Sequence, residues 1–353
     1  MTASNAPTEK PPSTALVAAV VIFYIVAALA MIVANKWVLN LTTAPLFFLL
    51  IQLVIAVLLF GIADVFKLFP DRLTFDLKIC RSLAPMVALN VVGISFSNYT
   101  LKYVDASFYQ VARGLVLPFT VAASFAMLHT RPSVRILASC AIVTAGFFCG
   151  VLLDGTPLSL IGLAFGVASS SVTALASVVI KQSLSVVDGS TILLSWYTNA
   201  LSAVVLVPLV LVAGEGPRVV ALLSGAPNPD APLTAPPQLQ TFFWGSLVTG
   251  AVGFLMSIAG PLSIKVTSPI THMISSAVRG VASSFLGQWF FHDIISGGRA
   301  ASIAVVLGGS IYYTWVKHQE TQATFAEHAY ERVAMDDLEN GKLDDVDFSE
   351  EAR

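Results

Sequence analysis

The chain has 353 residues, of which 56% are hydrophobic and only 11% are charged. Soluble domains carry about 25% charged residues, so this composition excludes a soluble fold. A net charge of −2 offers no basic surface for nucleic acid, and three cysteines, an odd number, predict neither a disulfide framework nor a metal site. The apolar residues come in runs of about 20, the length at which a helix crosses ~30 Å of hydrocarbon. The composition therefore predicts a polytopic membrane protein and indicates no cofactor.

The apolar runs predict ten membrane spans. A polar segment, 1–14, precedes the first span, which we expect to be retained because it is longer than the apolar core of a signal peptide. Most connections are short, except for the Pro- and Gly-rich stretch 214–240, and the acidic residues 319–353 are typical of a mobile tail. The predicted spans cover residues 15–34, 44–66, 82–100, 106–128, 134–153, 158–180, 191–213, 241–262, 269–291 and 300–316.

Basic residues outside the spans are unevenly shared between the two sides of the membrane. Ten spans place both ends of the chain on one side, and loops rich in Lys and Arg stay in the cytosol. We therefore expect both termini in the cytosol and the loop 214–240 on the opposite side. The expected cytosolic set is Lys10, Lys67, Arg72, Lys78, Arg81, Arg131, Arg135, Lys181, Lys265 and Lys317, and the opposite set is Lys36, Lys102, Arg218 and Arg299.

Two segments of the chain repeat one pattern. Residues 101–120, LKYVDASFYQVARGLVLPFT, and residues 264–285, IKVTSPITHMISSAVRGVASSF, each begin with a lysine near the membrane edge and continue as an apolar helix interrupted by Arg-Gly. The arginines, Arg113 and Arg279, fall in the fourth and ninth spans. Two halves of five spans, 15–153 and 154–318, must enter the membrane in opposite directions. The sequence predicts an all-α membrane protein with ten transmembrane helices as two inverted five-helix repeats, and a substrate site where they meet.

Both arginines lie near the middle of the membrane. At a rise of 1.5 Å per residue, Arg279 is about 16 Å along its helix from Ser268, and Arg113 is about 12 Å from Asp105. An arginine at that depth costs at least ~2.5 kcal/mol unless water or a counter-charge meets it. Each arginine could pair with backbone carbonyls or face a wet crevice for packing reasons. Because no Asp or Glu lies deep in a predicted span, we favour a central cavity that binds an anion, and phosphate matches the planar donor fork of arginine.

Polar side chains near the arginines extend this candidate site. The stretch SWYTNALS in the seventh span could contact a base or could hold helices together. The absence of a deep carboxylate favours anion exchange over proton coupling, since His272 is the one histidine at this level. The further candidates are Tyr197, Thr198 and Asn199 in the seventh span, Asn98 in the third, Tyr109 and Gln110 in the fourth, and Thr271 and Ser275 in the ninth.

Several ordered motifs resemble a known family. LKYVDASFYQVARGL, SVVIKQSLSVVDGS, SWYTNA, IKVTSPITHMISSAVRG and GGSIYYTWVK are similar to segments of nucleotide-sugar transporters in the drug/metabolite transporter superfamily, and most of all to the GDP-fucose transporter branch. The resemblance covers about residues 20–318. It implies a ten-helix Golgi antiporter that brings a GDP-sugar into the lumen and returns GMP, without enzymatic activity and without a cofactor. Monomer and homodimer both stay open.

The resemblance also assigns roles to residues. The basic residue of the family's SPLTH…K segment falls on Arg279, and that of its fourth span falls on Arg113. The family's base-reading FYNN falls on residues 196–199, with Thr198 in place of an asparagine, and its NK pair falls on Asn35 and Lys36, where the lysine could reach phosphate or anchor the helix at the interface.

Other functions stay open at this point. GDP-mannose transporters carry GALNK where this chain reads ISSAVRG, and plastid triose-phosphate translocators carry two adjacent basic residues where this chain has Arg279 and Gly280. Another nucleotide sugar, GDP-mannose or a UDP-sugar, or a phosphorylated metabolite remains an alternative substrate. An intramembrane enzyme would need paired aspartates or HExxH, which the sequence lacks. A structural protein that binds lipid head groups would carry its arginines near the helix ends.

Overall fold

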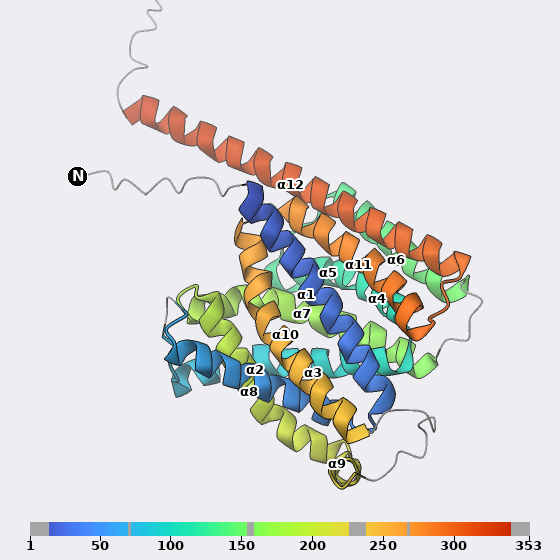
Figure 1. Ribbon diagram of the computed structural model, residues 1–353. Coiled ribbons are helices and arrows are strands. Elements are labelled where there is room, and N and C mark those ends of the chain that lie inside the picture. The colour runs from blue at the N-terminus through green and yellow to red at the C-terminus, as the bar shows by residue number, and fades with distance from the viewer. Residues whose placement is uncertain (1–13, 70–71, 154–158, 226–237, 267–268, 340–353) are drawn as a thin grey trace, which may run out of the picture.

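The computed structural model describes residues 14–69, 72–153, 159–225, 238–266 and 269–339, but not the side chains of residues 14–17, 181–182, 260–274, 276–277 and 324–339. The described chain is helical throughout and contains no strand (Figure 1). Its helices are α1 (Thr14–Leu41), α2 (Pro45–Val65), α3 (Leu77–Tyr103), α4 (Ala106–Gly114), α5 (Val116–Leu128), α6 (Val134–Leu152), α7 (Leu160–Val186), α8 (Thr191–Val212), α9 (Gly216–Leu223), α10 (Gln238–Val266), α11 (Pro269–Phe291) and α12 (Gly297–Glu339).

Eight helical segments in the described part of the chain are long and apolar enough to cross a membrane. They coincide with the first eight predicted spans and confirm an all-α membrane protein. The predicted spans 269–291 and 300–316 are also helical, in α11 and α12, but fall outside this set; polar residues such as Arg279 lower the mean hydropathy of α11. The eight segments are Ala18–Leu41, Pro45–Val65, Leu77–Tyr103, Ala106–Leu128, Val134–Leu152, Leu160–Ile180, Thr191–Val212 and Gln238–Ala259.

The fourth span differs from the single helix that the sequence predicts, because it is broken into α4 and α5. Pro118 has no N–H, so it cannot donate to the carbonyl of Gly114, four residues back. The amide of Leu115 donates to the Ala112 carbonyl, three residues back, at 3.2 Å, as in a turn tighter than that of an α-helix. A side chain on Gly114 would collide with Val306 of α12. The helix is therefore interrupted by one tighter turn at Leu115, directly after Gly114 and two residues past Arg113.

The predicted loop 214–240 contains the short helix α9 and a buried charge. Glu215, fully buried, precedes α9, and its carboxylate accepts hydrogen bonds from the backbone amides of Leu46 at 3.0 and 3.1 Å and of Phe47 at 2.9 Å. The hydroxyl of Tyr99 donates to the same carboxylate at 3.2 Å. An anion is favourable at a helix N-terminus because the first amides lack partners within the helix. Glu215 therefore fixes the start of α2 and ties it to α3.

The acidic tail also differs from its prediction, because α12 continues through residues 319–339 as one helix of 43 residues. Residues 317–339 contain many strong helix formers, such as Ala, Glu and Gln, and neither Gly nor Pro. In Figure 1 this part of α12 projects beyond the bundle. Residues 340–353 of the predicted tail lie outside the described residues.

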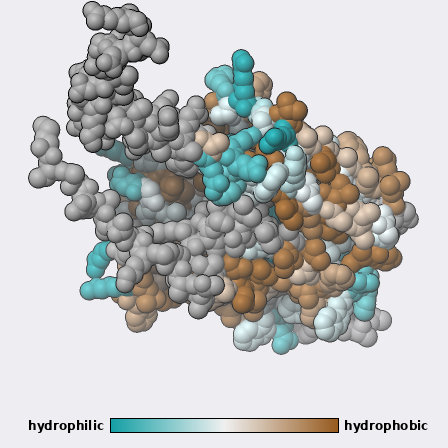
Figure 2. All heavy atoms as spheres, turned by 90° about the horizontal axis from the view of Figure 1, so that it is seen from above, coloured by the Kyte–Doolittle hydropathy of each residue, from teal (hydrophilic) through white to brown (hydrophobic). Residues whose placement is uncertain are grey.

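Helices of the two halves of the chain pack against one another. The main pairs are α3 with α7, α6 with α12, α1 with α10, α2 with α10, α2 with α8, α5 with α7, α1 with α11, α3 with α8 and α4 with α11. Many large apolar side chains, including Val65, Leu160 and Val212, stay exposed on the outside of this bundle. Figure 2 shows apolar residues over broad areas of one face. Such a surface suits a protein surrounded by lipid tails rather than by water.

Close packing of α6 on α12 generates a first prediction. A Cβ atom added at Gly150 of α6 would lie 2.5 Å from Ser302 Oγ and 3.0 Å from Val111 Cγ1, whereas one added at Gly61 of α2 would meet nothing within 4 Å. We expect Gly150→Ala to destabilise the protein by about 1–3 kcal/mol through overpacking. The matched Gly61→Ala should hold or raise stability, because alanine favours the helix by about 0.5–1 kcal/mol. Melting temperatures in detergent that shift equally would contradict this packing.

Candidate functional site

The two arginines at the middle of the bundle share one cavity. Arg113, at the end of α4, and Arg279, in the middle of α11, both line a cavity of about 280 Å³. Arg113 also lines an adjoining cavity of about 210 Å³ between α3 and α7, so its exposed surface borders the interior of the protein. The two guanidinium groups are near enough for their charges to repel each other. The structure thus brings together the two residues that the sequence predicts to bind an anion.

A larger cavity continues this space toward α8. It has a volume of about 910 Å³ and shares the lining residues Asn90, Ile94 and Ile180 with the 210 Å³ cavity. The 210 Å³ cavity in turn shares Arg113 with the 280 Å³ cavity. Thr198 and Asn199, two of the predicted base-contacting residues, line it. The Nδ2 of Asn199 donates to the Ser195 carbonyl at 2.8 Å, and the Thr198 hydroxyl donates to the Leu194 carbonyl at 2.7 Å. These bonds hold both side chains along the wall of the cavity.

Each arginine lies over a tyrosine ring. The Cζ of Arg113 is 5.7 Å from the centroid of Tyr109, and its Nη1 donates to the Tyr109 hydroxyl at 3.3 Å. That hydroxyl in turn donates to Ser97 Oγ at 3.4 Å. The Cζ of Arg279 is 5.8 Å from the centroid of Tyr24 on α1. A ring face stabilises a desolvated cation by roughly 2 kcal/mol, so the tyrosines offset part of the cost of burying these charges.

Neither arginine forms an ion pair within the described part of the chain. The Nε of Arg279 is buried and has no hydrogen-bond partner there. Tyr24, the neighbour of Arg279, is a residue that the sequence reasoning missed, because one aromatic residue in an apolar span carries no signal of the helix it faces. The site therefore presents positive charge to the cavity and keeps one guanidinium N–H without a partner among the described residues, which is an arrangement that an anion can satisfy.

Further predicted residues surround the arginines. Gln110 lines the 280 Å³ cavity, and its side chain packs against Gly280, where an added Cβ would lie 2.6 Å from Gln110 Nε2. Asn98 is buried, with its Nδ2 lacking a hydrogen-bond partner among the described residues. Ser275 is buried in α11, four residues before Arg279. Thr271 and His272 belong to α11, but their side chains lie outside the described residues.

Tyr197 lies apart from the cavities. It is fully buried, its hydroxyl accepts a hydrogen bond from the Asp76 amide at 2.8 Å, and its ring stacks on Phe75 with the centroids 6.3 Å apart. It lines none of the three cavities. Tyr197 thus ties the first turns of α8 to the residue that caps the start of α3, while its neighbours Thr198 and Asn199 face the cavity.

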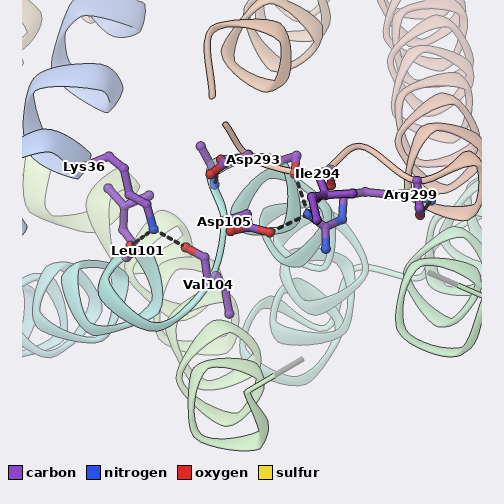
Figure 3. Close-up of polar contacts among 10 residues, drawn as sticks. Lys36, Leu101, Val104, Asp105, Asp293, Ile294 and Arg299 are labelled. Atoms are coloured by element: carbon purple, nitrogen blue, oxygen red, sulfur yellow. Dashed lines mark hydrogen bonds and ion pairs between the residues drawn. The ribbon is translucent and has the colours of Figure 1, made fainter. Parts of the chain in front are cut away.

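Lys36 also lies outside the cavities, in a network of charged residues at the end of the bundle where α1 and α3 end. Its Nζ donates to the carbonyls of Leu101 at 2.8 Å and Val104 at 2.6 Å, the last acceptors of α3 (Figure 3). We call Lys36, Asp105, Asp293 and Arg299 the ionic network. The sequence reasoning treated Lys36 and Arg299 as basic residues outside the spans, whereas both are buried.

The network joins α4 to the residues between α11 and α12. The Nη1 of Arg299, fully buried in the first turn of α12, donates to Asp105 Oδ2 at 2.7 Å, to Ser107 Oγ at 2.9 Å and to the Ile294 carbonyl at 2.9 Å. The Oδ2 of Asp293 accepts a hydrogen bond from the first amide of α4, that of Ala106, at 2.9 Å. Burial raises the pKa of the Asp293 carboxyl, and this amide acts in the opposite direction.

Comparison with known proteins gives consistent matches over most of the chain. A family model described as the Triose-phosphate Transporter family matches residues 15–314. GDP-fucose transporter 1 of Mus musculus is 32% identical, over 87% of this chain and 85% of that protein. GDP-fucose transporter 1 of Dictyostelium discoideum is 31% identical, over 86% and 81%, and a GDP-fucose transporter, Golgi, of Drosophila melanogaster is 30% identical, over 85% and 90%. These matches confirm the resemblance that the sequence motifs indicate.

The different surroundings of two buried arginines generate a second prediction. Removing one partner from a buried ion pair is destabilising, whereas an apolar residue in place of an uncompensated buried charge is neutral or stabilising. We expect Arg299→Met to destabilise the ligand-free protein by roughly 1–3 kcal/mol, because it leaves Asp105 and Ser107 without their donor. Arg279→Met should raise the melting temperature. Equal losses of stability in the two variants would contradict the assignment of Arg279 as an uncompensated charge.

Proposed function

Because the chain belongs to the triose-phosphate transporter family, a family of transporters rather than enzymes, we propose that it carries GDP-fucose into the Golgi lumen and returns GMP to the cytosol. The observation that carries this proposal is a cavity lined by two arginines and, among the described residues, by no carboxylate. The relatives named as GDP-fucose transporters, one of them in the Golgi, support the choice of substrate and compartment. Another nucleotide sugar, such as GDP-mannose or a UDP-sugar, or a phosphorylated metabolite is the alternative.

The arginines suit a diphosphate. A guanidinium presents parallel N–H donors that match two phosphate oxygens, and charge-assisted bonds of this kind are about twice as strong as neutral ones. Two guanidinium groups on the walls of one 280 Å³ cavity can divide the charge of a diphosphate between them. We assign Arg113 and Arg279 to the phosphates, with Tyr109 and Gln110 holding them in place. Lys36 is occupied by backbone carbonyls, so it is not part of this assignment.

The remaining part of the ligand extends into the larger cavity. The 910 Å³ space shares Asn90, Ile94 and Ile180 with the 210 Å³ cavity that Arg113 lines, and its wall combines apolar residues with the amide groups of Gln52 and Asn199. Amides offer both donors and acceptors to the edge of a base and to sugar hydroxyls. We assign Thr198 and Asn199 to contacts with the base, and Tyr197 to fixing the segment that carries them.

Exchange follows from the same electrostatics. An empty cavity leaves two cations that repel each other in a medium of low dielectric constant, so moving the empty site across the membrane is costly. A bound anion removes this cost, and reorientation is therefore fastest when either GDP-sugar or GMP occupies the site. Alternating access with a loaded carrier in both directions gives antiport without a proton-coupling carboxylate.

Helix packing supports two inverted repeats of five spans, residues 15–153 and 154–318. We count α4 and α5 together as the fourth span and leave α9 out, which gives ten spans. If each span is replaced by the span five positions away, a pair of helices in contact becomes another pair that is also in contact. The pair α3 with α7 becomes α10 with α1, α2 with α10 becomes α8 with α3, and α5 with α7 becomes α11 with α1. The pairs α2 with α8, α4 with α11 and α6 with α12 map onto themselves. On this topology both termini face the cytosol and 214–240 faces the lumen.

A third prediction concerns exchange and substrate. Proteoliposomes loaded with GMP should take up labelled GDP-fucose faster than GDP-mannose or UDP-galactose, and vesicles loaded with UMP or left empty should not. GMP inside the vesicle drives uptake because the loaded carrier returns faster than the empty one. UMP-driven uptake of a UDP-sugar would contradict the guanine assignment, and no uptake of any nucleotide sugar would contradict the proposed function.

A fourth prediction concerns the phosphate site. Arg279→Ala should reduce GMP-driven uptake of GDP-fucose at least tenfold, because a hydrogen bond to a charged group contributes about 1.5–3 kcal/mol. Arg113→Ala should act in the same direction. The matched control is Arg218→Ala, which removes an exposed arginine of α9 that lines none of the three cavities. Uptake by Arg279→Ala equal to that of the control would contradict the assignment.

A further inference from the structure

The ionic network connects the two halves of the chain at one end of the bundle. Three contacts link the start of α4 to Asp293, which follows α11, and to Arg299, in the first turn of α12. Figure 3 shows the contact of Asp105 with Arg299, and the other two are Ser107 with Arg299 and the Ala106 amide with Asp293. Lys36 acts within the first half, where it holds the last carbonyls of α3 beside α1. The network therefore fixes α4 and α11 to each other at their shared end.

Between the start of α4 and the end of α11 the packing is close. A Cβ atom added at Gly287 of α11 would lie 2.7 Å from Asp293 Oδ2 and 3.1 Å from the Cβ of Ala106. Ala106 itself is buried. No residue of the ionic network lines any of the three cavities that contain the candidate site. Between α4 and α11, the path from the arginines toward this end is closed.

The large cavity reaches the opposite end of the bundle. Its lining includes Thr191, the first residue of α8, and Leu184, in the last turn of α7. The contact of Tyr197 with Asp76 places the start of α8 beside the start of α3, and the ionic network lies at the end of α3. The cavity therefore extends from the middle of the membrane toward one side, and the ionic network closes the other.

The contacts of the network are of a kind that can break and re-form. The Asp105 side chain is 41% exposed, so water can replace Arg299 as its partner, whereas the Arg299 side chain is only 1% exposed. Water competes for the exposed carboxylate of this pair, which makes the contact weaker than one between two fully buried charges. When α4 and α11 separate, Asp105 can therefore exchange Arg299 for water as its hydrogen-bond partner. When the two helices come together again, the pair re-forms.

We propose that the ionic network is the gate on the side of the membrane away from the large cavity, and that substrate passes this side only when the contacts of Asp105, Asp293 and Arg299 between α4 and α11–α12 break. The proposal rests on the proposed exchange of nucleotide and nucleotide sugar. It predicts that a covalent link across the gate stops transport but leaves the site open to ligand from the other side.

The positions of Ala106 and Gly287 allow this test. Their Cβ atoms would be 3.1 Å apart, so a shift of a few tenths of an ångström brings them into the ~3.5–4.5 Å range of a disulfide. The variant Ala106→Cys with Gly287→Cys is made in a chain whose native cysteines, Cys80, Cys140 and Cys149, are replaced by serine. Copper phenanthroline lets oxygen take two electrons and two protons from the thiols to form the disulfide, and dithiothreitol reverses it. Peptide mass spectrometry measures the cross-linked fraction.

The cross-linked protein should lose GMP-driven uptake of GDP-fucose in proteoliposomes, down to the level of protein-free vesicles, and recover it with dithiothreitol. GMP should still raise its melting temperature, because ligand reaches the arginines from the open side. Each single-cysteine variant should be insensitive to oxidant. Uptake by fully cross-linked protein at the rate of the reduced protein would overturn the gate. Absence of uptake in the unmodified chain would instead contradict the proposed function.

A second measurement needs neither the disulfide nor transport. A cysteine at position 106 is buried while the gate is closed, so a membrane-impermeant maleimide should label Ala106→Cys slowly. Adding Asp105→Asn removes a carboxylate that Arg299 contacts, and it should raise the labelling rate several-fold. The matched addition of Asp188→Asn, which alters an acidic residue of the short turn between α7 and α8, should leave the rate unchanged. A labelling rate that Asp105→Asn does not change would overturn the gate.

Discussion

Positive charge at the middle of a lipid bilayer is the constraint on which this structure depends. Arg113 and Arg279 lie there without a carboxylate, and the surrounding architecture lowers the cost without neutralising the charge. The tyrosines supply ring faces and a hydroxyl, and both guanidinium groups line a cavity instead of being enclosed by apolar side chains on every side. Each device stabilises a cation and leaves part of its hydrogen-bonding capacity for a ligand. A fully neutralised site could not hold an anion.

Other buried charges in the described chain have hydrogen-bond partners of opposite polarity, so the shortage of such partners is confined to the two arginines. Glu215 is satisfied by backbone amides at the start of α2, Lys36 by carbonyls at the end of α3, and Arg299 by Asp105, a serine and a carbonyl. These groups lie near helix ends, where unpaired backbone atoms are available as partners. Arg279 lies in the middle of α11, where a continuous helix offers none, and Arg113 donates to the Tyr109 hydroxyl rather than to the backbone. Arginine thus stabilises the fold at position 299, where it has protein partners, and is available to bind an anion at positions 113 and 279.

The sequence predicts those features that a single helix determines. Apolar length identifies the spans, and counting residues from their ends places both arginines near the middle of their spans, because helix rise is constant. Contacts between helices are not encoded in this way. Tyr24 meets Arg279 and Asp105 meets Arg299 only through the packing of α1 on α11 and of α4 against α12. The break after Gly114 had a visible cause in Pro118, but the apolar run around it concealed the interruption.

The two proposed elements, the phosphate site and the gate, share α4 and α11. Arg113 lies near one end of the nine-residue α4, and Asp105 directly precedes the other. On the opposite wall, Arg279 lies in α11 and Asp293 follows its end. A bound diphosphate replaces repulsion between the arginines with attraction to a common anion, so it changes the force between the same helices whose ends form the gate. A rigid short helix transmits this change along its length. Occupancy of the site and closure of the gate are then coupled without any additional element, and a carrier that opens efficiently only when loaded follows from the position of the charges.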